Sequence, residues 1–522
     1  MDKSKSMQII KWLLVGLFAT LIIYFLFAVN VYGKRWFANP YNTRLQKQKN
    51  VVESGEILDR NGSRLAVVKD SKRRYNENKD VRIAVSHTVG DTQGLTASGA
   101  ENIFAKQLLG FDKNVFERIY QLIMSSNNGT SRGSDVMLTI DAKLCEYVAQ
   151  KMGKNKGAVV LLNYKTGEIY AMVSKPGFDP NNIESYRNIQ ESGYDPTVLV
   201  NRATMGLYPP GSVFKIVTAA AEIRQNPEAM TRTWDSSGPM AFSIENNKYL
   251  SDVKITAEQD KALKAIQKKV EKDPDQIVEN DEEAEFYTES TNDYNLLRNY
   301  NLTYFGEVDL KKAFAKSCNV TFAQIGLELG ADKVSKMARN FGIGENFMFN
   351  DVVVYKSSYT KSKEDYYLAW SAVGQYKDLV TPMNVALISA AIANDGAMVE
   401  PKLLKGIIGS LNYSNYIFKT KVHSHPLTVD EAQKMKELMR ACVTEGTGSA
   451  AGLKNYKVGG KTGTAEVSEN GQIKSHAWFT GYVDDADHPL AIAVVLEKAG
   501  TGGSKAAPIA GDIFARAIKL GY

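Results

Sequence analysis

An uncharged apolar segment near the N-terminus, Trp12–Val29, constrains the fold of this chain more than any other feature. It is about as long as a membrane-spanning helix requires. A buried helix would show a polar stripe and a signal peptide would end in a small-x-small cleavage site, and the segment has neither. We therefore expect an uncleaved anchor over residues 9–33, preceded by a short cytoplasmic tail of residues 1–8. Basic residues are balanced on its two sides, so the flanking charges do not set the orientation.

The rest of the chain has the composition of a folded globular protein. Of its 522 residues, 44% are hydrophobic and 23% are charged, and a chain of this length is expected to form roughly two or three domains. The net charge of +6 is mild, and no basic run interleaved with aromatic residues indicates nucleic-acid binding. The three cysteines are widely spaced and the five histidines form no His-Glu-x-x-His motif. We expect no metal site and no cofactor.

Strand and turn patterns predict a small mixed module over residues 34–135 and a larger domain over residues 136–522. In the module, a short strand ends at the Asn61–Gly62 turn, and an amphipathic pattern predicts a helix over Ala100–Met124. Within the larger domain, residues 255–285 are dominated by Lys, Glu, Asp and Gln. This composition indicates a solvated helical insertion or a mobile loop, with a docking surface as a further alternative.

Strand patterns stand at both ends of the larger domain. A strand leads into a helix that Asp141 caps, and a long hairpin follows over residues 157–173. Helical patterns fill the middle of the domain, so we expect an α+β fold with one antiparallel sheet formed by both extremities. Three strand-like segments close the domain, at Lys461–Val467, His476–Val483 and Leu490–Glu497.

One serine has the sequence setting of an activated nucleophile. A serine hydroxyl attacks well only when a base at fixed reach takes its proton, and residues three apart lie on one face of a helix. Ser212 and Lys215 have this spacing, follow a Pro-Pro-Gly break and precede an apolar helical run. Ser212 would then lie in the first turn, near the positive end of the helix dipole. From this motif alone, an N-terminal capping serine is an equally good interpretation.

Two further motifs favour catalysis. Residues 461–464, Lys-Thr-Gly-Thr, open a strand whose small residues leave its edge free for an extended peptide. Residues 317–319, Ser-Cys-Asn, lie between two helical runs. Chance copies of the three patterns occur without such settings at Ser251–Lys254, Ser358–Lys361, Lys165–Gly167, Ser410–Asn412 and Ser468–Asn470.

The three motifs in this order resemble those of penicillin-binding proteins and active-site serine β-lactamases, with Cys318 in place of the aspartate of Ser-Asp-Asn. The chain is most similar to class B penicillin-binding proteins, and its Asn39–Arg44 segment to their compact Gram-positive branch. Ser54 departs from the Arg-Gly that usually begins the family's first strand. The resemblance implies a pedestal module followed by a transpeptidase domain whose antiparallel sheet is flanked by helices. The similar segments are Glu56–Ala66, Gly157–Pro180, Tyr208–Lys215, Gly306–Phe322, Val380–Pro401 and Gly446–Tyr482.

The resemblance also implies catalytic roles. Ser212 would attack the carbonyl carbon of the penultimate D-alanine of a peptidoglycan stem peptide. Lys215 would be the general base, with a pKa lowered by burial and by Lys461. Ser317 would relay a proton to the leaving amine, and Asn319 would hold Lys215 and the substrate amide.

The strand motif would bind the substrate. Lys461 would supply positive field for the substrate carboxylate, which Thr462 and Thr464 would bind, with Gly463 between them in the substrate-binding set. Backbone N–H groups of Ser212 and Thr464 would form the oxyanion hole. β-Lactams resemble the D-Ala-D-Ala end and would acylate the serine as inhibitors.

Other functions share these motifs. A class D-like β-lactamase, a β-lactam-binding sensor and a non-enzymatic divisome or elongasome scaffold are the alternatives. Size and a single anchor favour the D,D-transpeptidase, with its catalytic domain outside the cytoplasmic membrane. The segment before Val136 is too short for a glycosyltransferase domain. Polymerisation would then come from a partner, a SEDS-type glycosyltransferase, and other divisome or elongasome membrane proteins would be further partners.

Overall fold

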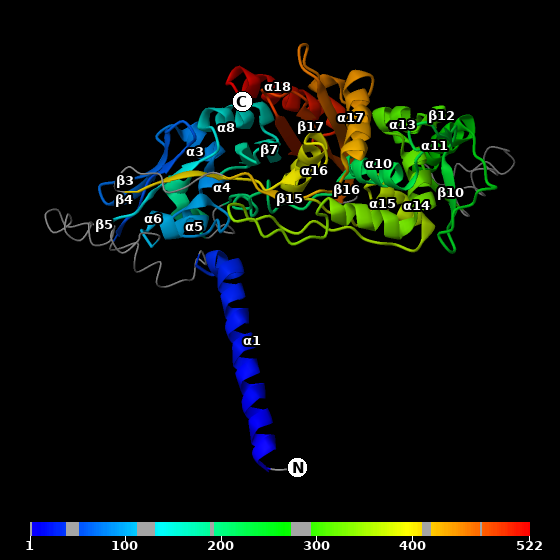
Figure 1. Ribbon diagram of the computed structural model, residues 1–522. Coiled ribbons are helices and arrows are strands. Elements are labelled where there is room, and N and C mark those ends of the chain that lie inside the picture. Colours follow the sequence, from blue (N-terminus) through cyan, green and yellow to red (C-terminus); the bar gives the residue numbers. More distant parts are fainter. Residues whose placement is uncertain are drawn as a thin grey trace.

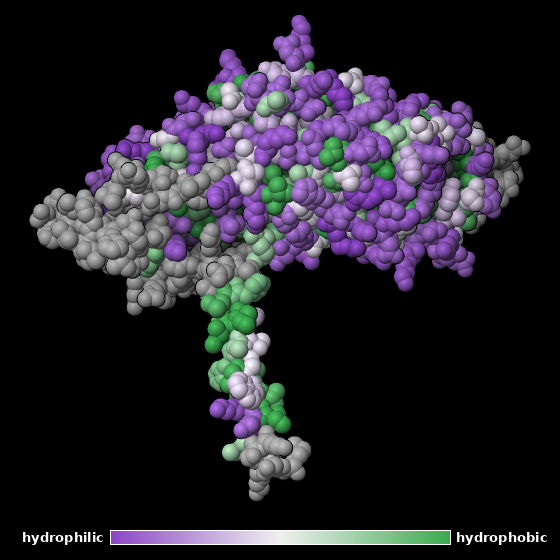
Figure 2. All heavy atoms as spheres, in the orientation of Figure 1, coloured by the Kyte–Doolittle hydropathy of each residue, from purple (hydrophilic) through white to green (hydrophobic). Residues whose placement is uncertain are grey.

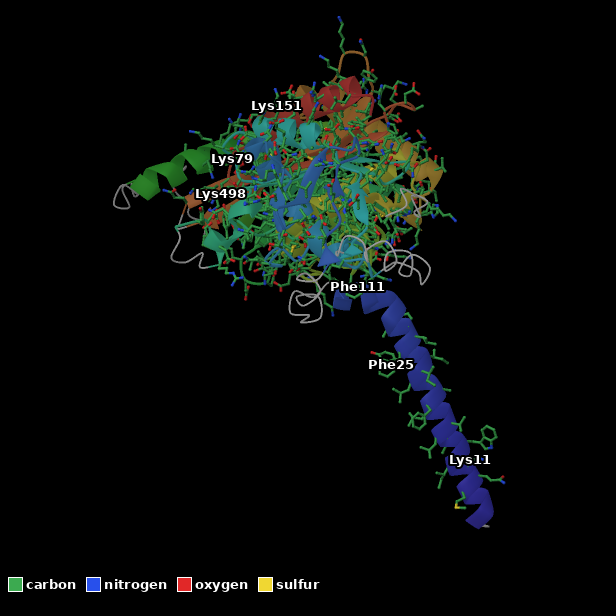
Figure 3. All side chains as sticks on the ribbon, turned by 90° about the vertical axis from the view of Figure 1, so that its left-hand side faces the viewer. Lys11, Phe25, Lys79, Phe111, Lys151 and Lys498 are labelled. Carbon is green, nitrogen blue, oxygen red and sulfur yellow. The ribbon has the colours of Figure 1, made fainter. Side chains whose placement is uncertain are left out.

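The computed structural model describes residues 3–37, 52–111, 131–187, 193–272, 294–409, 419–469 and 472–522. Helix α1 (Lys3–Phe37) leaves the body as one long rod (Figure 1). Its stretch Met7–Ala28 is long and apolar enough to cross a membrane. Figure 2 shows this apolar rod against a largely hydrophilic body, and Figure 3 shows Phe25 and Lys11 on it, well away from the body. The helix agrees with the predicted anchor.

The larger sheet has five antiparallel strands in the order β16-β17-β18-β7-β8, so the two ends of the larger domain meet as predicted. Every residue of β7 and β18 is buried. The reason is that helices α8 (Ala142–Met152) and α18 (Ala507–Lys519) cover one face and α16 (Pro382–Ala393) covers the other (Figure 1). Asp141 caps α8, as predicted, by accepting from the Leu144 N–H at 2.9 Å. The strands are β7 (Gly157–Asn163), β8 (Ile169–Lys175), β16 (Val458–Glu469), β17 (Gln472–Val483) and β18 (Leu490–Leu496).

A second five-stranded sheet, in the order β14-β6-β2-β3-β4, contains three strands from the N-terminal module, β2, β3 and β4. Strands β2 and β6 are parallel, and the other pairs are antiparallel. Strand β6 spans the predicted domain boundary at residues 135–136, and β14 comes from the larger domain beyond it. The boundary itself stays a prediction. The Asn61–Gly62 turn joins β2 to β3, as expected. The strands are β2 (Ile57–Leu58), β3 (Arg64–Lys69), β4 (Lys72–Tyr75), β6 (Asp135–Leu138) and β14 (Leu404–Ile408).

The helix predicted over Ala100–Met124 is present over Ala100–Leu108, but it is interrupted there. Two four-residue helices, α5 (Ala100–Ile103) and α6 (Ala105–Leu108), are separated at Phe104. Phe104 has non-helical dihedrals and packs in the core, so tertiary packing outweighs the helical periodicity there. Residues 112–124 lie outside the described residues. Two short helices precede this region, α3 (Lys79–Ala84) and α4 (Ser86–Val89).

A helical region packs against the β16 side of the larger sheet (Figure 1). The charged insertion begins there with helix α11 (Ala257–Lys272), so the helical alternative is right over these residues, whereas residues 273–285 lie outside the described part. The other helices of this helical region are η2 (Gly211–Phe214), α10 (Lys215–Gln225), α13 (Leu310–Lys316), α14 (Asn319–Asn340), α15 (Asp365–Val373) and α17 (Val429–Thr444).

Short strand pairs and turns complete the described structure. Strands β9 and β12 form one antiparallel ribbon, and β10 and β11 form another beside it. The strands are β1 (Val52–Glu53), β5 (Ser131–Arg132), β9 (Thr233–Ser236), β10 (Met240–Ser243), β11 (Tyr294–Leu297), β12 (Gly306–Asp309), β13 (Met398–Val399) and β15 (Val422–Ser424). The short helical turns are η1 (Pro180–Tyr186), η3 (Tyr300–Leu302), η4 (Ser449–Ala451) and η5 (Gly502–Ala506).

Candidate active site

Ser212 lies in η2, the tight turn that opens into α10, as its Pro-Pro-Gly setting predicts. Gly211 adopts a left-handed backbone with φ of +54°, and its N–H donates to the carbonyl of Gly374 at 2.9 Å. On the other side, the indole N–H of Trp478 donates to the carbonyl of Pro209 at 3.0 Å. The turn is therefore fixed between the helical region and the larger sheet, and it presents Ser212 at their junction.

Lys215 is the centre of a dense polar cluster. Its Nζ lies 2.8 Å from Ser212 Oγ and 2.7 Å from Asn319 Oδ1. It also donates to the Ser317 carbonyl at 3.0 Å. All three partners are oxygen atoms that accept from the Lys215 amine, and the Lys215 side chain is fully buried. The amine is thus held within reach of the Ser212 proton, which is the first geometric requirement of a general base.

Ser317 connects the two buried lysines. It ends α13 in a left-handed conformation with φ of +61°, which turns its hydroxyl back toward the sheet. Lys461 Nζ donates to Ser317 Oγ at 2.9 Å, and Lys215 Nζ lies 3.3 Å from the same oxygen. A hydroxyl both donates and accepts, so the position of Ser317 Oγ between the amines is compatible with the predicted proton relay.

Burial controls the electrostatics of this cluster. It lowers the pKa of Lys215 well below the ordinary value, the charge of Lys461 lowers it further, and Cys318 opposes both. Burial also lowers the pKa of Lys461. A low dielectric disfavours the charged form of an amine, and a neighbouring like charge adds to the effect. Lys215 therefore favours the neutral form that a general base needs.

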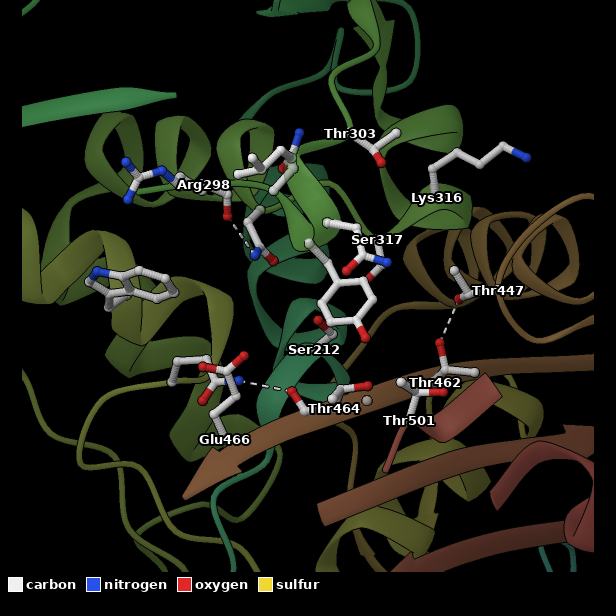
Figure 4. Close-up of a pocket in the computed structure, with 18 of the residues that line it drawn as sticks. Ser212, Arg298, Thr303, Lys316, Ser317, Thr447, Thr462, Thr464, Glu466 and Thr501 are labelled. Atoms are coloured by element: carbon white, nitrogen blue, oxygen red, sulfur yellow. Dashed lines mark hydrogen bonds between the residues drawn. The ribbon is translucent and has the colours of Figure 1, made fainter. Parts of the chain in front are cut away.

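The third motif lies on β16, at the edge of the larger sheet. Thr462, Gly463 and Thr464 line one cleft of about 1100 Å³ together with Ser212, Ser317 and Asn319, while Lys215 and Lys461 lie buried beneath its floor. Figure 4 shows Ser212, Ser317, Thr462 and Thr464 around this opening. The structure thus brings together all eight residues named from the sequence. The roles assigned to them stay predictions.

The sequence motifs did not point to several cleft residues. Thr447 Oγ1 lies 2.5 Å from Thr462 Oγ1, and Gln375 Nε2 donates to the Thr464 carbonyl at 2.8 Å (Figure 4). Thr447 lies inside the Gly446–Tyr482 segment that resembles the family, so a signal for it existed. Gln375 lies outside every segment used for the resemblance.

Cys318 caps a helix. It is the N-cap of α14, its Sγ accepts from the Thr321 N–H at 3.4 Å, and it lies 3.0 Å from Ser236 Oγ. The side chain therefore faces the fold, and a small capping group is what this position needs. The replacement of the motif's aspartate leaves Ser317 and Asn319 in the cleft.

The second Lys-Thr-Gly copy, Lys165–Gly167, forms part of a hairpin turn, as predicted. Asn163 Oδ1 accepts from the backbone N–H groups of Lys165 and Thr166 at 2.8 and 2.9 Å, which closes the β7–β8 hairpin. Among the Ser-x-x-Lys copies, Ser251 is exposed and donates to Asp252, and Ser358 pairs with Leu379. Neither opens a buried helix.

Comparison with known proteins gives one family. Residues 157–259 and 261–515 match the family model described as the penicillin binding protein transpeptidase domain. Peptidoglycan D,D-transpeptidase PbpA of Mycolicibacterium smegmatis is 28% identical over 453 residues, which cover 82% of this chain and 81% of that protein. Peptidoglycan D,D-transpeptidase MrdA of Haemophilus influenzae is 27% identical over 412 residues, 72% of this chain and 55% of that protein. The solved penicillin G acyl-enzyme complex of penicillin-binding protein A from M. tuberculosis has a TM-score of 0.70 at 26% identity, covering 90% of this chain and 100% of that one.

Proposed function

The chain belongs to the penicillin-binding protein transpeptidase family and is a serine-type peptidoglycan D,D-transpeptidase of class B, and we propose that its acyl-enzyme forms on Ser212. The prediction of a β-lactam-binding transpeptidase is confirmed at the level of the family. The 2.8 Å contact between Ser212 Oγ and the buried Lys215 Nζ is the main evidence that Ser212 is the nucleophile. Among the Ser-x-x-Lys copies, this is the one that opens a buried helix.

In the first step, neutral Lys215 takes the hydroxyl proton while Ser212 Oγ attacks the carbonyl carbon of the penultimate D-alanine. The tetrahedral oxyanion is held by the backbone N–H groups of Ser212 and Thr464. As the intermediate collapses, the C–N bond breaks and the proton passes through Ser317 to the amine of the departing D-alanine. An ester to Ser212 remains.

Substrate orientation comes from the strand side of the cleft. Thr462 and Thr464 hydroxyls bind the terminal carboxylate, Gly463 keeps the strand edge open between them, and Lys461 supplies positive field. Asn319 holds Lys215 and the substrate amide. In the second step, an amine from a neighbouring stem peptide attacks the ester, forms the cross-link and releases Ser212.

β-Lactams follow the same first step. Attack by Ser212 opens the lactam ring, and the amine that would leave stays tethered to the acyl group. No leaving group vacates the cleft, so the acceptor amine is kept out and the enzyme stays acylated.

The apolar α1 helix supports single-pass membrane attachment. We place the catalytic domain outside the cytoplasmic membrane, because its substrate, cell-wall peptide, lies there. The chain between the anchor and the transpeptidase domain is short for a polymerase domain. A SEDS-type glycosyltransferase and other divisome or elongasome membrane proteins are therefore its proposed partners. Residues 34–135 are proposed as the pedestal module, and residues 136–522 as the transpeptidase domain.

Labelling by a fluorescent penicillin tests the nucleophile directly. The full-length chain in detergent micelles should be labelled, Ser212→Ala should lose all label, and Ser251→Ala, at an exposed serine of the same pattern, should keep it. Mass spectrometry of the digested wild type should place the adduct on the peptide that contains Ser212. Label on the Ser212→Ala chain would assign the nucleophile to another residue.

A further inference from the structure

A buried carboxylate links the charged insertion to the wall of the catalytic cleft. Asp260, on α11, is completely buried although its neighbours Glu258, Gln259 and Lys261 are exposed. Its Oδ1 accepts from Arg298 Nε at 2.6 Å, and its Oδ2 accepts from the Tyr304 hydroxyl at 2.5 Å. A buried charge needs such partners. Asp260 therefore ties α11 to the segment 298–304, of which residues 298–303 line the cleft.

The same segment holds the Ser-x-Asn motif from its other side. The Asn299 Oδ1 accepts from the backbone N–H of Val320 at 3.0 Å, in the first turn of α14. Asn299 Nδ2 donates to Ser236 Oγ at 3.1 Å, which fixes the amide. The carbonyl of Arg298 accepts from Asn319 Nδ2 at 2.9 Å, a bond drawn in Figure 4.

This last bond determines which end of the Asn319 amide faces the base. A backbone carbonyl only accepts, so Asn319 must turn its NH₂ group toward Arg298. Its oxygen then points at Lys215 Nζ, 2.7 Å away. In the opposite orientation the amide would present N–H donors to Lys215 and two carbonyl oxygens would face each other. The position of the Arg298 carbonyl thus governs the orientation of Asn319.

We propose that Asp260 is a positioning residue for acylation: by binding the Arg298 guanidinium it fixes the carbonyl that orients Asn319 against Lys215. The chain of contacts runs from α11 through Arg298 and Asn319 to the general base. The charged insertion is then part of the catalytic framework as well as a solvated surface. This inference rests on the catalytic roles proposed above for Lys215 and Asn319.

Stopped-flow acylation by a chromogenic cephalosporin tests the proposal on the full-length chain in detergent. Asp260→Asn should lower the limiting acylation rate constant about tenfold, because sub-ångström misplacement of catalytic groups has effects of this order. The dissociation constant of the non-covalent complex should stay within about twofold, because Asp260 contacts no substrate. Glu258→Gln removes the same charge from an exposed position on the same helix and should change neither constant.

A double-mutant cycle separates positioning from a general structural role. Asn319→Ala should slow acylation by itself, and adding Asp260→Asn to it should cause no further loss. A tenfold loss in both backgrounds, or an unchanged rate in Asp260→Asn, would overturn the proposal. A wild-type rate in Asn319→Ala would instead remove the proposed role of Asn319. If Asp260→Asn unfolds, Arg298→Lys, which keeps the charge but alters the donor geometry, carries the same test.

Discussion

Gly211 gives the sharpest test of how the nucleophile turn is seated. A β-carbon on this residue would lie 2.7 Å from the carbonyl oxygen of Thr464 and 2.9 Å from its carbonyl carbon. Both are backbone atoms of β16, which is held by its pairing with β17 and does not move aside easily. Gly211 also has a φ of +54°, a conformation that side chains disfavour. Gly211→Ala therefore forces the turn that carries Ser212 away from β16.

The expected magnitude has two parts. A left-handed backbone with a β-carbon costs about 1–2 kcal/mol. Overpacking against atoms that cannot yield costs about 1–3 kcal/mol more. The free energy of unfolding should therefore fall by roughly 2–5 kcal/mol. Acylation should fall by about a hundredfold, because relief of the clash separates Ser212 from Thr464, its proposed partner in the oxyanion hole, by a sizeable fraction of an ångström.

A matched variant isolates the clash from the strain. Gly62 has a φ of +82° in the turn between β2 and β3, and a β-carbon there would meet nothing within 4 Å. Gly62→Ala should lose about 1–2 kcal/mol of stability and acylate at the wild-type rate. Both variants are compared by urea unfolding and by stopped-flow β-lactam acylation. If Gly211→Ala acylated within about threefold of the wild type, far short of the loss expected for misplacement, the close seating of Ser212 on β16 would be refuted.

Two further predictions concern buried charges. Lys461→Met should move the low-pH limb of the acylation rate to higher pH, because the proposed mechanism needs neutral Lys215 and the charge of Lys461 lowers the pKa of Lys215. An unmoved limb in stopped-flow pH profiles would contradict this. Arg202→Met should lower the free energy of unfolding by about 3 kcal/mol, because it removes the 2.7 Å partner of Glu497. Arg187→Met, at an exposed pair, should stay within about 1 kcal/mol in the same urea titration, and equal losses would count against the burial argument.

Elements with a strong local pattern could be predicted from the sequence. The hairpin of β7 and β8, the three last strands and the Asp141 cap all carry their signal within a few residues. Pairings between distant segments leave no such local signal in the sequence. Strand β9 pairs with β12 some seventy residues later, Trp234 opposite Val308, and only the folded chain brings them together. The break at Phe104 was missed for the same reason, since core packing and not periodicity sets it.

The candidate site divides in the same way. Ser212 and Lys215 were predictable because both lie on one helical turn, and the two other motifs are equally compact. Arg298 was not, because it acts through its backbone carbonyl, which any residue would supply. Gln375 contacts the backbone of Thr464, and Asn299 contacts the backbone of Val320, the residue after the Ser-x-Asn motif. Residues that support a motif through the main chain leave no distinctive spacing in the sequence.

Asp260 supports the site through its contacts and not through an effect on the pKa of Lys215. A free negative charge near Lys215 would raise its pKa and favour the protonated amine, which accepts no proton from Ser212. The groups that shift the pKa of Lys215 are burial, Lys461 and Cys318, and Asp260 is not one of them. Its charge is instead met by the Arg298 guanidinium at 2.6 Å. Arg298 thus has two separable functions, neutralising Asp260 with its side chain and orienting Asn319 with its carbonyl. Loss of the first should leave the buried Asp260 carboxylate without its cationic partner, and loss of the second should free the Asn319 amide to turn away from Lys215.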